Sequence, residues 1–289
     1  MDLFTPDYLL YLLAFISMNL MTVMGYNLIF GKGKILHFGV EGVSLVASYA
    51  FVIALFASQS FAMGFVVSAI CVMLISALFA WMSFRLEPDG FGILSISVHL
   101  SLIAIVLNWD SLTRGALGIP QIPRLPFLES AQNFAIVSVS VTAVWIAVLW
   151  LLDRSSFGRK LAALAEHEWH AAAVGISRKR THFLAFLIGG FGSVLGGFFY
   201  TQYVHLLHPN DYLYPSLLFF VMLVVAGKPG NIIGLIISTI TLTFLKEGLR
   251  FVPLDSSVVG PLRLLLFGVI LLAAVFWRRK TLFPQRRVV

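Results

Sequence analysis

Nine stretches of mostly apolar residues follow one another along the chain, each close to the length of a membrane-spanning helix. A spanning helix needs about 20 predominantly apolar residues to cross the hydrocarbon core. The stretches cover residues 8–30, 42–58, 61–84, 91–109, 134–152, 183–204, 212–227, 230–249 and 258–277, and the second begins at or before position 42. A barrel would require segments of about ten residues with alternating polarity, which the chain does not show. The pattern predicts an all-α, polytopic transmembrane helical bundle with about 8–10 spans.

The composition supports a membrane protein and excludes two other classes. Of the 289 residues, 59% are hydrophobic and 11% are charged, with a mean hydropathy of +0.94. Soluble domains carry about 25% charged residues, so this chain has too few charges to cover a soluble surface. An ordinary soluble enzyme and a disordered chain are therefore excluded, and we expect an integral, multi-pass membrane protein.

The distribution of basic residues predicts the orientation of the chain. The net charge is +7, with 20 Lys and Arg residues, and loops rich in these residues face the cytoplasm. An outside N-terminus places most of them inside, namely Lys32, Lys34, Arg85, Arg154, Arg159, Lys160, Arg178, Lys179, Arg180, Lys228, Arg278, Arg279, Lys280, Arg286 and Arg287. We expect an inside C-terminus, and the positive charge gives no reason to expect a nucleic-acid partner.

Two loops between the stretches are long. Residues 110–133 contain several Gly and Pro residues and are expected to form an ordered external turn region. Residues 153–181 form the longest charged loop and have the character of a soluble helix. Because no soluble domain is attached, we expect one transmembrane domain over residues 1–289, with 153–181 as its cytoplasmic segment.

The segment FGRKLAALAEHEWHAAAVGISRKR at 157–180 is the sharpest local feature. Its Ala and Leu content predicts a helix, and Gly175 is a stop signal. On a continuous helix one face would carry Arg159, Glu166, His167 and His170, and the other would carry Leu161, Leu164, Ala165 and Trp169. Two interpretations stay open: a helix lying on the membrane surface, or a helix that docks to a cytoplasmic partner through its apolar anchors.

No catalytic or metal-binding motif is found. A nucleotide-binding loop needs G-x-x-x-x-G-K-[ST], and neither Gly31-Lys32 nor Gly227-Lys228 fits that pattern. His167 and His170 are three residues apart, whereas a zinc-binding H-E-x-x-H pair needs four. The single cysteine, Cys71, is interpreted as a small core residue.

Three polar residues fall in or beside apolar stretches. Glu41 and His37 lie at the edge of the second stretch, and His99 lies inside the fourth. A carboxylate at the bilayer centre costs about 2.5–3.5 kcal/mol on insertion scales, so Glu41 should face the bundle interior or a wet path. We assign all three residues to a transmembrane polar path as a hypothesis. A hydrogen bond from Glu41 to broken backbone and a packing role for His99 remain the alternatives.

Glycine pairs four residues apart predict close helix packing. Gly192 and Gly196 lie in the sixth stretch, and Gly230 and Gly234 lie at the start of the eighth. Such spacing lets two helix backbones approach each other. A moving interface is the other interpretation of these glycines.

Several short motifs, in order, carry a resemblance to a known family. They are SFGR at 156–159, AAAVGI at 171–176, LAF at 184–186, GGFFY at 196–200, GALGIP at 115–120 and GKPGNIIG at 227–234. The chain resembles permeases of branched-chain amino acid-type ABC importers over residues 27–250, and LivM-like members among them. It departs from them in LHFGVEG at 36–42, where Val40 replaces an expected His and GVEG is more similar to nucleoside-type permeases.

The resemblance implies a permease subunit without catalytic residues, cofactor or metal, whose ATP is used by a separate subunit. It implies coupling to that ATPase through the cytoplasmic segment, at Phe157, Gly158, Arg159, Leu161, Glu166, Trp169 and Gly175. Further implied partners are a second homologous permease, an external substrate-binding protein on loops such as 110–133, and the lipid of a bacterial inner membrane.

The substrate implied by the resemblance is a small polar solute, with branched-chain or other amino acids first. Urea, short amides and nucleosides are alternatives within the same class. Stand-alone secondary transporters usually show inverted repeats and several intramembrane charges. This chain shows no clear internal repeat and few charges within its apolar stretches, so that class is disfavoured.

Overall fold

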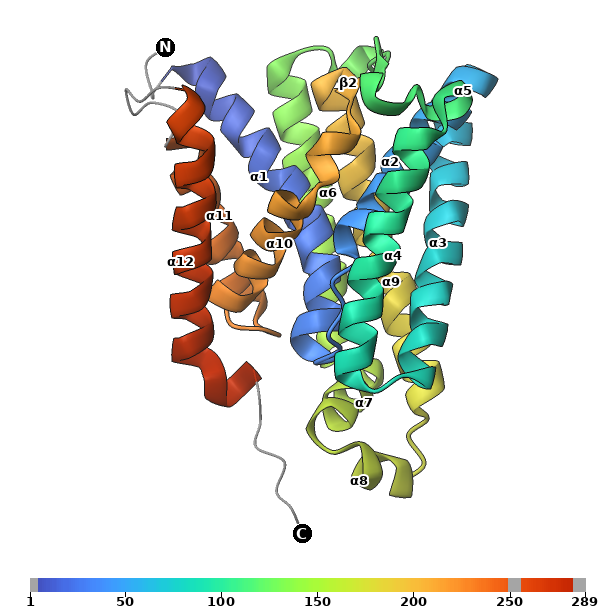
Figure 1. Ribbon diagram of the computed structural model, residues 1–289, viewed down its shortest axis with the longest axis vertical. Helices are drawn as coiled ribbons and strands as arrows, with labels where there is room; N and C mark the ends of the chain where they lie inside the picture. The colour runs from blue at the N-terminus through green and yellow to red at the C-terminus, as the bar shows by residue number, and fades with distance from the viewer. Residues whose placement is uncertain (1–4, 249–255, 283–289) are drawn as a thin grey trace.

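The computed structural model describes residues 5–248 and 256–282, and within these ranges the chain is a bundle of helices (Figure 1). The long helices are α1 (Pro6–Tyr26), α2 (Val40–Ser58), α3 (Phe61–Arg85), α4 (Pro88–Asn108), α6 (Ala131–Arg154), α9 (Arg178–Val204), α10 (Tyr214–Ala226), α11 (Ile232–Gly248) and α12 (Ser256–Leu282). Each predicted apolar stretch corresponds to one of these helices. The all-α transmembrane bundle predicted from the sequence is therefore confirmed.

Shorter elements join the long helices at the two ends of the bundle. They are the π-helix η1 (Asn27–Lys32), α5 (Asp110–Thr113), η2 (Gly115–Leu117), β1 (Ile119–Pro120), η3 (Pro126–Leu128), α7 (Ser156–Glu166), α8 (Glu168–Ala173), β2 (Leu206–Leu207) and η4 (Pro209–Tyr212). Across the described residues, eight helical segments are long and apolar enough to span a membrane. The helix α11, with 17 residues, is shorter and pairs with the 13-residue α10.

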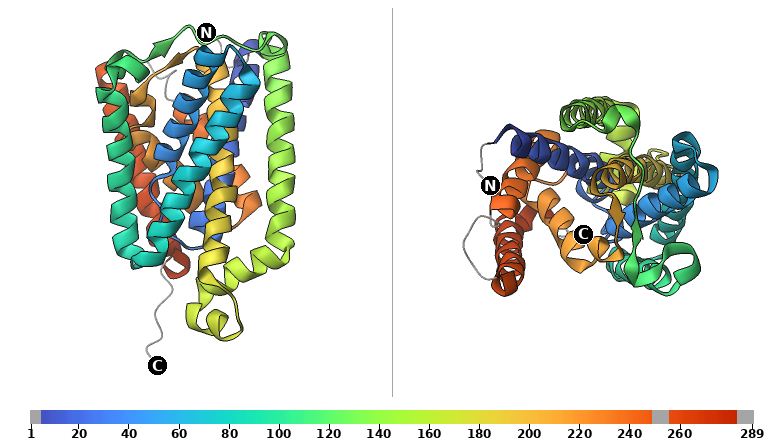
Figure 2. Two further views of the ribbon diagram at one scale, coloured as in Figure 1. Left: turned by 90° about the vertical axis from the view of Figure 1, so that its right-hand side faces the viewer. Right: turned by 90° about the horizontal axis from the view of Figure 1, so that it is seen from above.

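The two ends of the bundle differ in charge. The first residues of α1 lie at one end with α5, β1 and β2, and α7, α8 and the last turns of α12 lie at the other end (Figures 1 and 2). The α7–α8 end carries Lys32, Arg85, Arg154 and the basic run 178–180, so the positive-inside rule makes it the cytoplasmic end. We call the opposite end the outer end.

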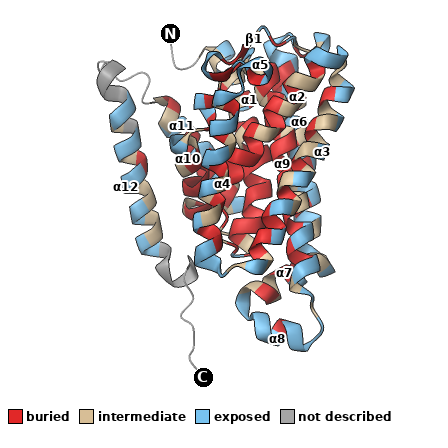
Figure 3. Ribbon diagram, turned by 45° about the vertical axis from the view of Figure 1, so that its right-hand side comes forward, coloured by how far each residue is buried: buried red, intermediate tan, exposed pale blue. Residues whose placement is uncertain are grey.

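The centre of the bundle is formed by α1, α2 and α9, which are largely buried, while α3, α4 and α6 expose apolar side chains (Figure 3). The glycine face of α9 allows this packing. A Cβ atom on Gly192 would lie 2.6 Å from the carbonyl oxygen of Met21, and one on Gly189 would lie 2.7 Å from that of Gly25. Backbones of α1 and α9 therefore touch, as small residues permit in membranes.

The helix α2 begins inside the bundle, after a non-helical segment at 33–39. This segment is held by hydrogen bonds to neighbouring helices: the Tyr26 hydroxyl donates to the His37 carbonyl at 2.7 Å, and the Phe38 amide donates to Ser95 Oγ at 2.8 Å. Irregular backbone at membrane depth is tolerated where protein covers it. The break places the first turn of α2, with Glu41, in the interior.

The loop at 110–133 is ordered and fixed to the outer end of α9. Ile119 pairs with Leu207 in the antiparallel β1–β2 pair. The Arg124 side chain donates to the carbonyl oxygens of Gln202 (2.7 Å) and Tyr203 (3.1 Å). The sequence-based expectation of an ordered turn region is confirmed.

Candidate functional site

A cavity of about 280 Å³ lies in the outer half of the bundle. Its walls come from α1 and α2 in the N-terminal part of the chain and from α9, η4, α10 and α11 in the C-terminal part. The lining residues are Phe15, Met18, Asn19, Thr22, Glu41, Ser44, Ser48, Gly196, Gly197, Tyr200, Asn210, Asp211, Tyr212, Ser216, Phe219, Phe220 and Lys246. Six elements thus surround a space that is polar on several sides and aromatic on others.

The cavity combines both signs of charge with hydroxyl and aromatic groups. Glu41 is 3% exposed, Lys246 is half-buried and Asp211 is exposed, and all three line the same cavity. The Lys246 ammonium lies 4.7 Å from the ring centroid of Phe219 and 5.2 Å from that of Phe15. Such an arrangement suits the binding of a small polar solute, because buried charges need partners of opposite sign.

Hydroxyl groups of the cavity are fixed by local hydrogen bonds. The Tyr212 hydroxyl donates to Ser48 Oγ at 2.7 Å, which joins η4 to α2. The Ser216 hydroxyl donates to the Asp211 carbonyl at 2.6 Å, at the start of α10. These bonds hold the outer wall of the cavity in one geometry.

The structure separates the three residues that the sequence assigned to a polar path. Glu41 lines the cavity, but His37 and His99 do not. The His37 ring lies among the rings of Phe79 (centroids 4.5 Å apart) and Phe186 (5.2 Å). His99 is fully buried against Gly42, and both ring nitrogens lack a hydrogen-bond partner within the described part of the chain. A role in the polar path stays a prediction for all three residues; only Glu41 lines this cavity, and the two histidines lie in packed positions outside it.

Sequence reasoning did not identify several residues of this cavity. Asp211 lies between two predicted stretches, and Tyr200, Tyr212 and Lys246 lie within predicted stretches, and none of the four was given a role at a site. One signal could have identified Lys246. It is an ionisable residue within an apolar stretch, and such residues often mark functional positions in membrane proteins. Asp211 and Lys246 approach Glu41 only through the tertiary fold, and no spacing in the sequence indicates it.

The cytoplasmic segment forms two helices and not one. The chain leaves the helical conformation at His167 (φ −148°, ψ 98°), between α7 and α8. Leu161 and Leu164 are buried, whereas Trp169 is 87% exposed. The prediction that Trp169 shares the apolar face of these leucines is wrong, because the break turns α8 relative to α7.

Leu161 packs inward and not toward a partner. It is 0% exposed and belongs to the main hydrophobic core, where α7 contacts α9 and η1. The prediction that Leu161 is an apolar anchor for a docking partner is therefore wrong, since its side chain is buried in the permease's own core. The larger exposed side chains of α7, α8 and the residues that join and follow them are Arg159, Lys160, Glu166, His167, Glu168, Trp169, His170 and Val174.

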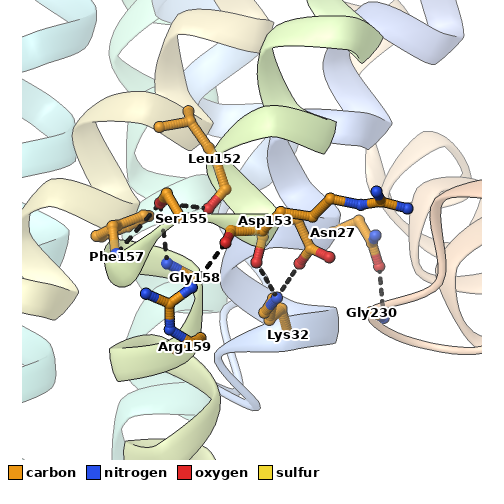
Figure 4. A network of polar contacts seen from close by, with 10 residues as sticks. Asn27, Lys32, Leu152, Asp153, Ser155, Phe157, Gly158, Arg159 and Gly230 are labelled. Carbon is orange, nitrogen blue, oxygen red and sulfur yellow. Dashed lines mark hydrogen bonds and ion pairs between the residues drawn. The ribbon is translucent and has the colours of Figure 1, made fainter.

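The turn from α6 into α7 is tight and capped (Figure 4). Ser155 Oγ accepts hydrogen bonds from the amides of Phe157 (3.2 Å) and Gly158 (3.5 Å), as an N-cap residue does. A Cβ atom on Gly158 would lie 2.6 Å from the carbonyl oxygen of Leu152, so glycine is required here. The α7 helix is thus joined closely to the end of α6.

Gly175 ends α8 as the sequence predicts. Its φ is +81°, and the amide of Ile176 donates to the carbonyl of Ala171 at 3.0 Å. This is the left-handed glycine ending of a helix. The Arg178 side chain then donates to Glu168 at 2.9 Å and to the Ser83 carbonyl at 2.8 Å, which fixes the segment to α3.

The two predicted glycine pairs have different environments. Gly192 and Gly196 face α1, as described above for α9. Gly230 lies in the turn between α10 and α11 with φ +80°, so its assignment to a helix-packing pair is wrong. The reason is the preceding Pro229, which with Gly230 forms a turn. Gly234 approaches the backbone of Gly227 across that turn.

Comparison with known proteins assigns the family. The sequence model of the family described as "Branched-chain amino acid transport system / permease component" matches residues 8–275. The chain belongs to this family. It is accordingly a permease subunit of the ABC transporter class, with a transport role, and a multi-pass integral membrane protein of the inner membrane in bacteria.

Individual relatives of this permease are distant. The chain is 23% identical to the high-affinity branched-chain amino acid transport system permease protein LivM of Escherichia coli (strain K12), over 91% of this chain and 67% of LivM. It is 29% identical to the autoinducer 2 import system permease protein LsrC of Klebsiella pneumoniae, over 39% of this chain and 36% of LsrC. Among solved structures, PsaBC from Streptococcus pneumoniae in complex with Fab has a TM-score of 0.53 at 14% identity, covering 94% of this chain and 91% of that one. This last similarity supports the fold alone.

Proposed function

We propose that this permease subunit carries amino acids, with branched-chain amino acids first, through the cavity that contains Glu41. The observation that carries the proposal is the mixed charge of the cavity, with Glu41 and Asp211 on one hand and Lys246 on the other. An amino acid zwitterion needs an anion for its ammonium group and a cation for its carboxylate. Phe15, Phe219 and Phe220 supply apolar surface for its side chain. The volume of about 280 Å³ is close to the lower range of small-ligand pockets.

The energy for transport comes, in this proposal, from a separate ATPase subunit. The sequence contains no phosphate-binding loop of the P-loop type, and the exposed side chains of α7 and α8 form a surface at the cytoplasmic end. ATP-driven closure of two ATPases would displace this segment and switch the permease between outward and inward access. The permease itself binds no cofactor.

Two further partners complete the proposed importer. A second, homologous permease would form the other half of the membrane channel. An external substrate-binding protein would dock at the outer end, where residues 110–133 are fixed on α9. The family name and the LivM relative support this assembly.

Reconstitution tests the proposed function. The permease is coexpressed with the ATPase, second permease and binding protein that adjacent genes encode. The complex is purified and placed in vesicles. We expect uptake of radiolabelled leucine that requires both ATP and the binding protein. An ATPase with its P-loop lysine replaced is the control. Accumulation by the isolated permease without ATP would refute the proposal.

A nucleoside is the second candidate substrate. The hydroxyl groups of Thr22, Ser44, Ser48, Tyr200 and Tyr212 in the cavity suit a sugar, and GVEG at 39–42 resembles nucleoside-type permeases. Competition experiments separate the candidates: excess leucine, urea, acetamide or adenosine is added to the uptake assay. Inhibition by adenosine and not by leucine would select the second candidate.

A further inference from the structure

The π-helical segment η1 (Asn27–Lys32) lies where three parts of the cytoplasmic end meet (Figure 4). The Lys32 ammonium contacts the carboxylate of Asp153 and donates to the Asp153 carbonyl at 3.1 Å. Asp153 lies in the last turn of α6, directly before α7. On its other side, η1 presents Asn27 Oδ1, which accepts the amide of Gly230 at 2.9 Å. One short segment therefore binds both the α6–α7 junction and the α10–α11 turn.

The Lys32–Asp153 ion pair is partly withdrawn from water. The side chain of Lys32 is 16% exposed and that of Asp153 is 33% exposed. A fully exposed pair contributes little, whereas loss of one partner of a buried pair leaves an uncompensated charge. The carbonyl at the C-terminal end of α6 adds to the attraction, because a cation is favoured there. The contact resists separation of η1 from the α6–α7 junction.

Close backbone packing reinforces both contacts of η1. A Cβ atom on Gly31 would lie 2.5 Å from the amide nitrogen of Gly230. A Cβ atom on Gly33, directly after η1, would lie 3.3 Å from a methyl group of Leu161 in α7. The segment η1 therefore contacts the α10–α11 turn at Gly31 and α7 at Gly33. Gly31 and Lys32 also border a cavity of about 500 Å³ that α7 and the α10–α11 turn line.

The elements joined at η1 are also the walls of the cavity. The helix α1 runs without interruption into η1 and carries Asn19 and Thr22 of the cavity. The helix α10 contributes Ser216 and Phe219, and α11 contributes Lys246. Two routes therefore lead from the α6–α7 junction to the cavity: one along α1, and one through Asn27 and Gly230 into α10 and α11.

We propose that Lys32 and Asn27 are positioning residues that transmit displacement of α7 to the cavity walls. Movement of Asp153 displaces Lys32, the hydrogen-bond register of η1 changes, and Asn27 transmits the displacement to the α10–α11 turn through its bond to Gly230. A π-helical segment is suited to this, because it is less stable than an α-helix and occurs often at functional sites. The proposal rests on the proposed function, since an ATPase must displace α7. The proposal couples α7 to the cavity through the contacts of η1.

Thiol labelling in the reconstituted complex tests the coupling without knowledge of the substrate. Cys71, the single cysteine, is replaced by Ala, and Ser216→Cys supplies a reporter in the cavity wall. The rate of modification by a water-soluble methanethiosulfonate is measured without nucleotide and with a non-hydrolysable ATP analogue. The variants are Lys32→Met, Asp153→Asn and Asn27→Leu, and Lys34→Met is the matched control. Asn27→Asp is a second control, because its side-chain oxygen can still accept the hydrogen bond from the Gly230 amide.

We expect the nucleotide to change the labelling rate at least about fivefold in the parent, in Lys34→Met and in Asn27→Asp, the lower range of allosteric coupling. In Lys32→Met, Asp153→Asn and Asn27→Leu the change should fall below about twofold, while the ATPase still copurifies. The exchanged pair Lys32→Asp/Asp153→Lys should restore part of the response.

Two outcomes overturn the inference. A full nucleotide response in Lys32→Met and Asn27→Leu would show that the contacts transmit nothing. Loss of the ATPase during purification of these variants, with no rescue by the exchanged pair, would show that they only support assembly. Failure of the proposed function is distinguishable, because the parent complex itself would then show neither ATP-driven uptake nor a nucleotide response.

Discussion

At the scale of single residues, Glu41 shows how the fold accommodates a carboxyl group inside a membrane-spanning bundle. It lies in the first turn of α2, whose N-terminus inside the bundle favours an anion. The non-helical segment at 33–39 makes this possible, because it lets α2 begin below the surface. A carboxylate there shares the cavity with Lys246 and Asp211.

If Glu41 binds the substrate as proposed, Glu41→Gln is expected to reduce uptake by about tenfold or more, because loss of one buried charged contact costs over about 1.4 kcal/mol. Assembly with the partner subunits should be unchanged, since Gln has the same shape. Initial rates of uptake in vesicles measure the effect. Glu87→Gln, at the cytoplasmic end and away from the cavity, is the control. Equal uptake in both variants would assign Glu41 a structural role.

Gly158→Ala is expected to lower stability by about 1–3 kcal/mol, the usual cost of overpacking. The added methyl group meets the Leu152 carbonyl and would push α7 away from α6. The thermal midpoint of the purified permease in detergent measures this. Gly90→Ala, where a Cβ meets nothing within 4 Å, should leave the midpoint unchanged or higher. Similar midpoints for the two variants would contradict the geometry of the turn.

At the scale of elements, the sequence predicts helices well and their interruptions poorly. The helices follow from apolar stretches that membranes require, and Gly175 was recognisable as a stop. The break at His167 was not recognisable, because EHEWH at 166–170 contains neither Gly nor Pro. Extending one helical period across that break placed Trp169 beside Leu161. The turn at Pro229–Gly230 did carry a signal, which the spacing of Gly230 and Gly234 concealed.

Replacement of a side chain by alanine should have different effects in α7 and in α8. Leu161→Ala is expected to destabilise the permease by about 2–5 kcal/mol, as removal of a buried leucine does. Trp169→Ala should leave stability unchanged and weaken copurification of the ATPase, because its ring is exposed. Thermal midpoints and pull-down yields of both variants make the comparison. The reverse assignment would require α7 to be the docking face and α8 the buried one.

At the scale of the whole molecule, the orientation follows from charge, while the cavity follows from topology. The basic residues at the α7–α8 end could be read from the sequence. The meeting of Glu41, Asp211 and Lys246 could not, because they come from three elements whose arrangement depends on the packing of α1 against α9. The sequence thus predicts the class of molecule and one cavity residue, and the remaining lining needs the fold.

Cysteine accessibility tests the orientation. In a Cys71→Ala background, Leu117→Cys in the outer loop should react with an impermeant maleimide in intact cells. Ala172→Cys in α8 should react only after the membrane is opened. Both native residues are exposed, so access alone decides the result. The opposite pattern would invert the assignment of the cytoplasmic end.

The 27-residue helix α9 has a consequence for communication across the bilayer. At its outer end, the carbonyl oxygens of Gln202 and Tyr203 accept hydrogen bonds from Arg124 of the loop at 110–133. At its inner end, Arg178 forms an ion pair with Glu168 of α8. At 1.5 Å per residue, this helix extends roughly 40 Å, about the thickness of a bilayer with its headgroups. One continuous helix thus contacts both the outer loop and the cytoplasmic segment, and a displacement of α9 along its axis would move its contacts at both membrane surfaces.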